Sequence, residues 1–192
     1  LPGLTLAIKE AFEFESAMNT AGEAIRDYIK GNQCRCRIFE IDHPDVFLWA
    51  VWAIQQYAKY VSEEQAWDKY WKLLMEMMDY LRHNRHVNFY VHTNGLVHIN
   101  GAEHAETWMN SSVNGVPVVP RTGYVVEINA LWYNALMFLG NLSEKYGKPD
   151  YAKRLQNLAK SAGVSFVKVF LNEHGYLFDF VDGNIPDWSV RP

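Results

Sequence analysis

The stretch Val46 to Tyr60, VFLWAVWAIQQYAKY, constrains the fold most, because it lacks glycine and proline and begins apolar on nearly every side of a helix. Such a helix has to be buried, since it has no polar face to turn towards water. Pro44 favours a break just before it, and Asp45 is placed to act as its N-cap. The chain is therefore predicted to build a helical core around residues 46–60.

Further segments carry helical signals on either side of this core helix. Ser62 to Gln65 has a capping-box pattern, and large apolar residues then recur at spacings of four and three: Trp67, Trp71, Leu74, Met78 and Leu81. Two more helices are predicted over 126–145 and 150–172, separated by the helix-ending triplet Gly147-Lys148-Pro149. Residues 6–30 are predicted to form one or two helices.

Strand signals are confined to two short regions. Residues 88–100 alternate in polarity around Asn94-Gly95, a dipeptide that strongly favours a hairpin with a tight primed turn, and residues 175–181 predict a short strand or turn. Residues 101–124 are rich in Gly, Pro, Ser and Asn and predict a long loop, and such loops are often functional. The predicted fold class is all-α with a small β-hairpin, and the pattern alone does not choose between a helical bundle and a helical barrel.

Charge and cysteine usage exclude several partners. The formal net charge is -4 without a long run of lysine or arginine, which disfavours a nucleic-acid partner. The longest apolar stretch, 46–54, is far shorter than the roughly twenty residues that cross a bilayer, so no membrane partner is expected.

Cys34 and Cys36 are too close in sequence to pair, which favours free thiols in a cytoplasmic enzyme. Residues 1–6 lack the basic and apolar regions of a signal peptide.

Polar and aromatic side chains concentrate in the predicted loop and in the helix after it. The loop carries a dense set: Glu103, His104, Glu106, Thr107, Trp108, Asn110, Asn114 and Arg121. The first turns of the helix add five more: Glu127, Asn129, Trp132, Tyr133 and Asn134. Burying such polar groups without partners would cost roughly 1 to 3 kcal/mol each. They are therefore expected either to hold the loop by hydrogen bonds or to line a cavity for a ligand with many hydroxyl groups.

Acid–base chemistry on a sugar would need two carboxyl groups on opposite faces of the ring. The candidates are spread along the chain, and no pair is singled out by its spacing: Asp42, Asp45, Glu103, Glu106, Glu127, Asp179, Asp182 and Asp187. The histidine pairs His83/His86 and His92/His98 do not form a dense ligand cluster, so no metal site is predicted. Gly-rich phosphate loops, GxSxG and paired CxxC motifs are absent, and no cofactor is expected.

Three segments resemble the signature of the amylo-α-1,6-glucosidase family of glycogen-debranching enzymes. T-W-M-N at 107–110, P-V-V-P-R-T-G at 117–123 and V-E-I-N-A-L-W-Y-N-A-L at 126–136 are similar to that family's T-W-M-D-A, P-V-T-P-R-x-G and V-E-I-N-A-L-W-Y-N-A-L. Shorter segments agree in the same order along the chain: Leu1 to Leu4, Asp45 to Trp49, Val181 to Gly183, and Arg191 with Pro192. The resemblance therefore extends over essentially the whole chain.

The resemblance implies an (α/α)6 barrel of the six-hairpin glycosidase type. It also implies hydrolysis of α-1,6-linked glucose at glycogen branch points by an inverting mechanism, without a metal or organic cofactor. The partners it implies are glycogen, limit dextrin or malto-oligosaccharide. Because such a barrel is longer than this chain, residues 1–192 are expected to form a single partial catalytic domain, truncated at both ends. Such a piece is expected to be inactive alone and to self-associate through uncovered apolar faces.

The resemblance also assigns site residues. It implies that five side chains bind the sugar: Trp108, Arg121, Glu127, Asn129 and Trp132. The Asp of T-W-M-D is implied to be the general acid, but this chain has Asn110 there, and an amide cannot donate a proton as a carboxylic acid does.

Three explanations of Asn110 stay open. Glu106 or Asp45 could supply the missing carboxyl group in a variant enzyme. Alternatively, the protein could be a helical module that binds glucan without cleaving it, or Asn110 could be an engineered residue. A related barrel enzyme acting on trehalose or another oligosaccharide is a further alternative.

Overall fold

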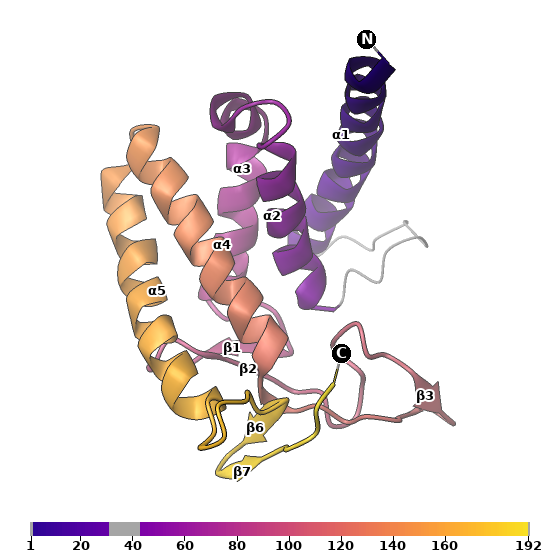
Figure 1. Cartoon of the computed structure of the whole chain (residues 1–192), viewed down its shortest axis with the longest axis vertical. Coiled ribbons are helices and arrows are strands. Elements are labelled where there is room, and N and C mark those ends of the chain that lie inside the picture. Colours follow the sequence, from indigo (N-terminus) through magenta and orange to yellow (C-terminus); the bar gives the residue numbers. More distant parts are fainter. Residues whose placement is uncertain (1, 31–42, 192) are drawn as a thin grey trace.

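The computed structural model describes residues 2–30 and 43–191, and the helices in that part stand side by side with the strands gathered near one of their ends (Figure 1). Five helices lie in the described part: α1 Pro2–Ile29, α2 Asp45–Tyr57, α3 Glu63–Arg82, α4 Val126–Lys145 and α5 Pro149–Phe170. Helix α4 packs along α5 on one side and against α2 on the other, and α3 contacts α1, α2 and α4. Three residues singled out from the sequence lie outside the described residues: Cys34 and Cys36, predicted to be free thiols, and Asp42, a candidate carboxylate.

The strands form a sheet larger than the predicted hairpin. Its antiparallel order is β1-β2-β5-β6-β7, built from β1 Phe89–Val91, β2 Val97–Ile99, β5 Gly123–Val125, β6 Phe180–Asp182 and β7 Ile185–Pro186. A separate pair, β3 Ser112–Val113 and β4 Val116–Pro117, interrupts the predicted long loop. Gly123 makes the β5–β6 pairing possible, because a Cβ at its φ of +88° would lie 2.4 Å from the Val181 carbonyl oxygen. The chain is mostly helical with a small antiparallel sheet, which agrees with the predicted all-α class with a minor β element.

Most helix boundaries follow the sequence signals. Ser62 caps α3 as predicted, since its Oγ accepts a hydrogen bond from the Gln65 N–H at 3.1 Å. Helix α4 begins and ends at the predicted residues, and residues 6–30 lie in one helix up to Ile29. The prediction that Asp45 is the N-cap of α2 was wrong: Pro44 holds that position without a side-chain hydrogen bond, and Asp45 is already helical.

The hairpin at Asn94-Gly95 forms, but not with the predicted primed turn. A two-residue primed turn of type I′ would need positive φ at both positions, whereas only Gly95 has one, at +85°. The Gly95 N–H instead donates to the His92 carbonyl oxygen at 2.9 Å, and the His92 N–H donates to that of Leu96. The connection is therefore a wider loop with a left-handed glycine near its end.

The position of the charged residues explains which helices form the core. Helix α2 has Asp45 as its only charged residue, and α4 has charged residues only in its first and last turns. Helices α3 and α5 carry charges along their lengths and bury one stripe each. Full burial of a side chain such as Phe47 or Leu136 contributes roughly 1.5 to 3 kcal/mol, so α2 and α4 supply much of the stability. No helix in the described part of the chain has both the length and the apolarity to cross a membrane.

Candidate functional site

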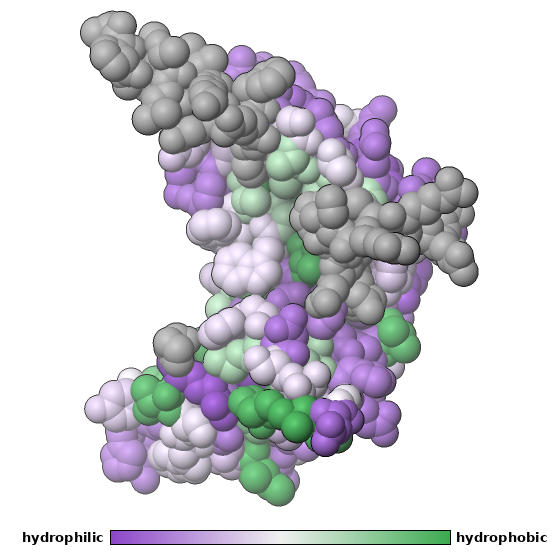
Figure 2. Space-filling view, turned by 90° about the vertical axis from the view of Figure 1, so that its right-hand side faces the viewer, coloured by the Kyte–Doolittle hydropathy of each residue, from purple (hydrophilic) through white to green (hydrophobic). Residues whose placement is uncertain are grey.

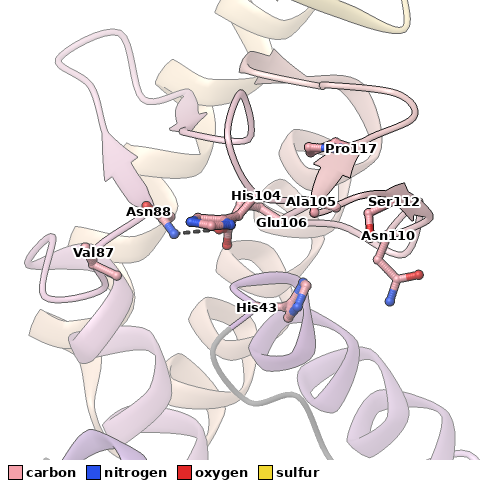
Figure 3. Close-up of a pocket in the computed structure, with 10 residues that line it drawn as sticks. His43, Val87, Asn88, His104, Ala105, Glu106, Asn110, Ser112 and Pro117 are labelled. Atoms are coloured by element: carbon pink, nitrogen blue, oxygen red, sulfur yellow. Dashed lines mark hydrogen bonds between the residues drawn. The ribbon is translucent and has the colours of Figure 1, made fainter.

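A cavity of about 540 Å³ opens where the loop after β2 passes the start of α2. This loop cavity is lined by residues from three parts of the chain: His43, Val87, Asn88, His104, Ala105, Glu106, Asn110, Ser112, Gly115 and Pro117. Figure 3 shows His43 on the α2 side, Val87 and Asn88 in the segment between α3 and β1, and the other labelled side chains on the loop. Its volume lies in the range of about 300 to 1,000 Å³ that is typical of small-molecule sites.

Glu106 and Asn110, two of the predicted catalytic positions, both line this cavity. The Glu106 side chain is held by Asn88, whose Nδ2 donates a hydrogen bond to Glu106 Oε1 at 2.6 Å. Glu106 is only 6 % exposed, whereas Asn110 is exposed. The structure therefore brings the replaced acid position and the nearest carboxylate of the loop into one cavity.

The segment between these two residues faces a second cavity. Trp108 and Met109 help to line a space of about 290 Å³ together with charged, aromatic, aliphatic and hydroxyl side chains: Arg121, Val126, Glu127, Tyr176, Leu177, Phe178, Asp179, Ser189, Val190 and Arg191. We call this space the arginine cavity. The Trp108 side chain is 51 % exposed, so its ring is accessible from solvent. Residues 106–110 thus form a wall with one cavity on each side.

Arg121 organises the arginine cavity through a buried ion-pair cluster. Its guanidinium binds both oxygens of Glu127, with an Nη2–Oε2 distance of 2.5 Å. The same group donates to Asp179 from Nε at 3.0 Å and from Nη2 at 2.7 Å. Arg191 approaches Asp179 from the other side, with an Nε–Oδ2 distance of 2.7 Å. Burial opposes the charge on Arg121, but the paired carboxylates outweigh it and raise its pKa.

The Arg121 cluster also fixes the wall between the cavities. Arg121 Nη1 donates to Thr107 Oγ1 at 3.4 Å, and the same hydroxyl accepts the N–H of Met109 at 3.3 Å. Arg121 and Glu127 were both predicted to bind sugar. Arg121 instead directs most of its N–H donors to Glu127 and Asp179, and both carboxylate oxygens of Glu127 accept from Arg121. Because Glu127 also lines the arginine cavity, its carboxylate still borders the space where a ligand would lie.

Asp45 lies beneath the same wall. Its buried carboxylate accepts the backbone N–H of Trp108 and that of Val46, which joins α2 to the loop. Burial raises the pKa of Asp45 to about 6, His43 acts in the opposite direction, and the charge of Glu127 adds to the increase. Asp45 lines neither cavity. Its contacts make it a link between α2 and the wall.

Asn129 and Trp132 occupy the core, which differs from the sugar-facing positions expected by resemblance. The Asn129 side chain accepts the Val97 N–H at 2.7 Å and donates to the carbonyl oxygens of Val97 and Val125, both at 2.9 Å. Trp132 is 0 % exposed, and its Nε1–H donates to the Gly95 carbonyl oxygen at 3.1 Å. These two side chains attach the β1–β2 hairpin to α4, and no surface for a sugar remains on them.

Asn88 and His43 were not singled out from the sequence as site residues. Asn88 is the first residue of the predicted hairpin segment, and it lines the loop cavity because its side chain reaches Glu106. His43 directly precedes the Pro44-Asp45 break, and that proximity was the one signal for it. Among residues 2–30 and 43–191, no group of three or more His, Cys, Asp or Glu side chains is arranged to hold a metal ion.

Comparison with known proteins adds one finding to this geometry. A family model described as Amylo-alpha-1,6-glucosidase matches residues 6–192, which is nearly the whole chain. No curated protein and no solved structure matches the chain. The family match includes both cavities and the wall between them.

Proposed function

Because the chain belongs to the amylo-α-1,6-glucosidase family, we propose that it forms the substrate-binding part of a glycoside hydrolase that removes α-1,6-linked glucose at glucan branch points. The proposed substrates are glycogen, limit dextrin and branched malto-oligosaccharides. In the proposal, α2 and α4 belong to the inner layer of an (α/α)6 barrel and α3 and α5 to its outer layer. The charge-free middles of α2 and α4 support this assignment, since inner helices are covered on both sides.

One observation carries the proposal: Glu106 and Asn110 line the same polar cavity, at the edge of a loop that carries an exposed tryptophan. A glucose residue bound there would meet amide, imidazole and hydroxyl groups that can bind its hydroxyls: Asn88, His104, Asn110 and Ser112. Since a cavity with a few convergent polar groups is the default binding site of an enzyme, the α-1,6-linked glucose is assigned to the loop cavity.

The proposed chemistry is an inverting hydrolysis with Glu106 as the proton donor. Glu106 gives its proton to the glycosidic oxygen as the bond from that oxygen to the anomeric carbon breaks, so the glucan chain leaves with a free 6-hydroxyl group. A water molecule attacks the anomeric carbon from the opposite face and passes its proton to a second carboxylate. By resemblance, that carboxylate belongs to later helices of the barrel. Burial raises the pKa of Asp45 to about 6, but Asp45 lines neither cavity, so the proposal assigns the proton donor to Glu106.

The direct test follows the first product formed by the complete protein on a branched limit dextrin. Glucose release is expected, and proton NMR at early times is expected to show the β-anomer, because inversion at an α-linked carbon yields it. Release of α-glucose first would contradict the inverting chemistry. The absence of any glucose would overturn the hydrolase.

Asn110 favours a second candidate, a module that binds glucan without cleaving it. An amide at the acid position leaves a pocket that still offers hydrogen bonds but no proton from that residue. Retardation of the protein in a native gel containing glycogen, combined with no glucose release, would support this candidate over the hydrolase.

A further inference from the structure

A chain of hydrogen bonds links Glu106 to the helical core through Asn88. Asn88 Nδ2 donates to Glu106 Oε1 at 2.6 Å, and the backbone N–H of Asn88 donates to His86 Nδ1 at 3.1 Å. The Asn88 carbonyl oxygen also accepts the N–H of Asn100, at 3.4 Å. Because its backbone is bound on both sides, Asn88 presents its amide to Glu106 from a fixed position.

The anchor of this chain is the His86 ring, which is only 1 % exposed. Three helices hold it, since its centroid lies 6.0 Å from that of Tyr28 in α1, 6.0 Å from that of Phe47 in α2 and 6.3 Å from that of Tyr80 in α3. Its Nδ1 accepts the Asn88 N–H only when that nitrogen carries no proton. The core therefore fixes both the ring and the residue that binds to it.

The anchor lies in the core, whereas the loop that carries Glu106 borders solvent. The part of the loop that leads to β3 lies on the right in Figure 1, and Figure 2 views the molecule from that side, where hydrophilic and hydrophobic residues mix over the lower surface. His104 and Asn110 of this loop are exposed, whereas His86 is buried. A ligand that enters the loop cavity from solvent therefore does not have to displace the anchor of Asn88.

The chemical nature of the Asn88 donor matters for a carboxyl group that has to lose a proton. In a carboxylic acid, the carbonyl oxygen accepts an amide N–H better than the hydroxyl oxygen does, so a donor at Oε1 places the proton of Glu106 on Oε2. After the proton has left, the same N–H binds a charged oxygen and the hydrogen bond becomes stronger. A neutral amide does this without holding Glu106 permanently ionised, as a guanidinium would.

We propose that Asn88 is a positioning residue for the proposed hydrolysis: it makes Oε2 the proton-donating oxygen of Glu106 and stabilises the carboxylate that remains. The glycosidic oxygen receives the proton from Oε2, and the electron pair of that O–H bond stays on Glu106. This inference rests on the proposed function for the role of Glu106. It goes further in assigning part of the catalytic effect to residues 83–88, between α3 and β1.

The test measures kcat and KM for limit dextrin across the pH range with the complete protein and its Asn88→Asp variant. Aspartate has the shape of asparagine but offers Oε1 an acceptor instead of a donor, so the proton of Glu106 is drawn towards Oε1 and away from Oε2. We expect kcat to fall roughly 10 to 100-fold, because a misplaced donor loses part of its effect. The alkaline limb of the kcat profile reports loss of the donor's proton. It should move up by about one pH unit, because a second carboxylate disfavours ionisation of Glu106.

Two further variants separate positioning from damage to the fold. Asn88→Ala removes the donor without adding a charge, so its alkaline limb should also move to higher pH, by less than that of Asn88→Asp. Asn84→Asp is the matched control, because it makes the same change in the same turn but outside both cavities. Asn84 Oδ1 accepts the Val91 N–H at 2.7 Å, and aspartate keeps that oxygen and tolerates the φ of +52°. The kcat, KM and pH profile of this control should stay unchanged.

The other titratable groups near Glu106 are common to all these variants. His104 lines the loop cavity from the loop, and His43 lines it from the segment before α2. Asp45 lies beneath the wall, and the Arg121 cluster lies across it. Their titration contributes equally to every profile, so a shift confined to the two variants at the amide reports the contact of that amide with Glu106.

The outcomes distinguish this inference from the proposed function. Glucose release with the same pH profile in the unchanged protein and in both Asn88 variants would overturn the inference and leave the hydrolase standing. A loss of kcat without a shift of the alkaline limb, accompanied by a lower midpoint of denaturant unfolding, would show a purely structural role and would also overturn it. No glucose release from the unchanged protein would overturn the hydrolase and, with it, the inference.

Discussion

The loop cavity and the arginine cavity share the wall at 106–110 but are built in opposite ways. In the loop cavity, Glu106 accepts a hydrogen bond from the Asn88 amide, and the lining combines imidazole, hydroxyl and amide groups. In the arginine cavity, the carboxylates of Glu127 and Asp179 are bound by guanidinium groups from Arg121 and Arg191. The first cavity is bordered by Glu106 among uncharged polar groups and histidines, and the second is bordered by carboxylates bound to two arginines.

This difference suggests separate roles for the two cavities: catalysis in the loop cavity and stabilisation of the wall in the arginine cavity. A carboxylate paired with a buried arginine is held in its charged form and is poorly suited to donate a proton. The Arg121 cluster instead fixes Thr107 and Met109, and so determines where the wall stands. Stability should therefore depend mainly on the arginine cavity, and proton transfer on the loop cavity.

The largest stability effect is expected from Arg121→Met. Removal of the guanidinium leaves Glu127 and Asp179 without their shared partner, which should lower the free energy of unfolding by about 3 to 5 kcal/mol. Denaturant unfolding measures the change. Arg154→Met, at an exposed arginine, and His104→Ala, in the lining of the loop cavity, are the controls, each expected to stay within about 0.5 kcal/mol. A loss below about 1 kcal/mol in Arg121→Met would contradict the structural role of the cluster.

A pH-dependent effect is expected from Asp45→Asn. The folded pKa of Asp45 is about 6, above its value of 3.8 when unperturbed, so folding favours the protonated form and ionisation destabilises the fold. The penalty is absent below pH 3.8, develops as the pH rises, and is complete above pH 6. Between pH 4 and pH 7.5, the free energy of unfolding of the variant should therefore rise by up to about 3 kcal/mol relative to that of the unchanged protein, at roughly 1.4 kcal/mol per pKa unit.

Unfolding curves at the two pH values measure this gain, with the exposed Asp68→Asn as the matched control. A difference between the Asp45 variant and the unchanged protein that is the same at both pH values would contradict a raised pKa at Asp45.

The smallest effect is expected from Trp108→Ala. Its ring is half-exposed in the arginine cavity, so the free energy of unfolding should change by less than about 0.5 kcal/mol. If the ring stacks on the substrate, KM for limit dextrin should rise roughly tenfold with kcat nearly unchanged, because the contact is made equally in the ground state and the transition state. An unchanged KM would show that Trp108 does not contact the substrate and that the arginine cavity only stabilises the wall.

Local signals predicted the helices well and the sheet poorly. The capping box at Ser62 and the apolar stripe of α3 are properties of neighbouring residues, and α4 was predicted to the residue for the same reason. The sheet joins β5 to β6, which are three residues long and far apart in sequence. A pairing of that kind depends on tertiary contacts that no periodicity in the sequence reports.

The same contrast applies to the site. Glu106 and Asn110 could be placed from the sequence because they lie four positions apart in one loop. The burial of Asn129 could have been inferred from its spacing of three to Trp132 and seven to Leu136, which puts the amide in the apolar stripe of α4. The pairing of Arg121 with Asp179 depends on how the C-terminal strands return to the loop, and only the folded chain supplies it.

The most direct test of the central claim compares glucose release from limit dextrin by Glu106→Gln and Asn110→Asp in the complete protein. With Glu106 as the proton donor, Glu106→Gln should lower kcat by about 10² to 10⁴-fold while the fold stays stable, and Asn110→Asp should change it by less than about threefold. A Glu106→Gln variant that keeps full activity, together with a large gain in Asn110→Asp, would show that the acid belongs at position 110 and would contradict the assignment of Glu106.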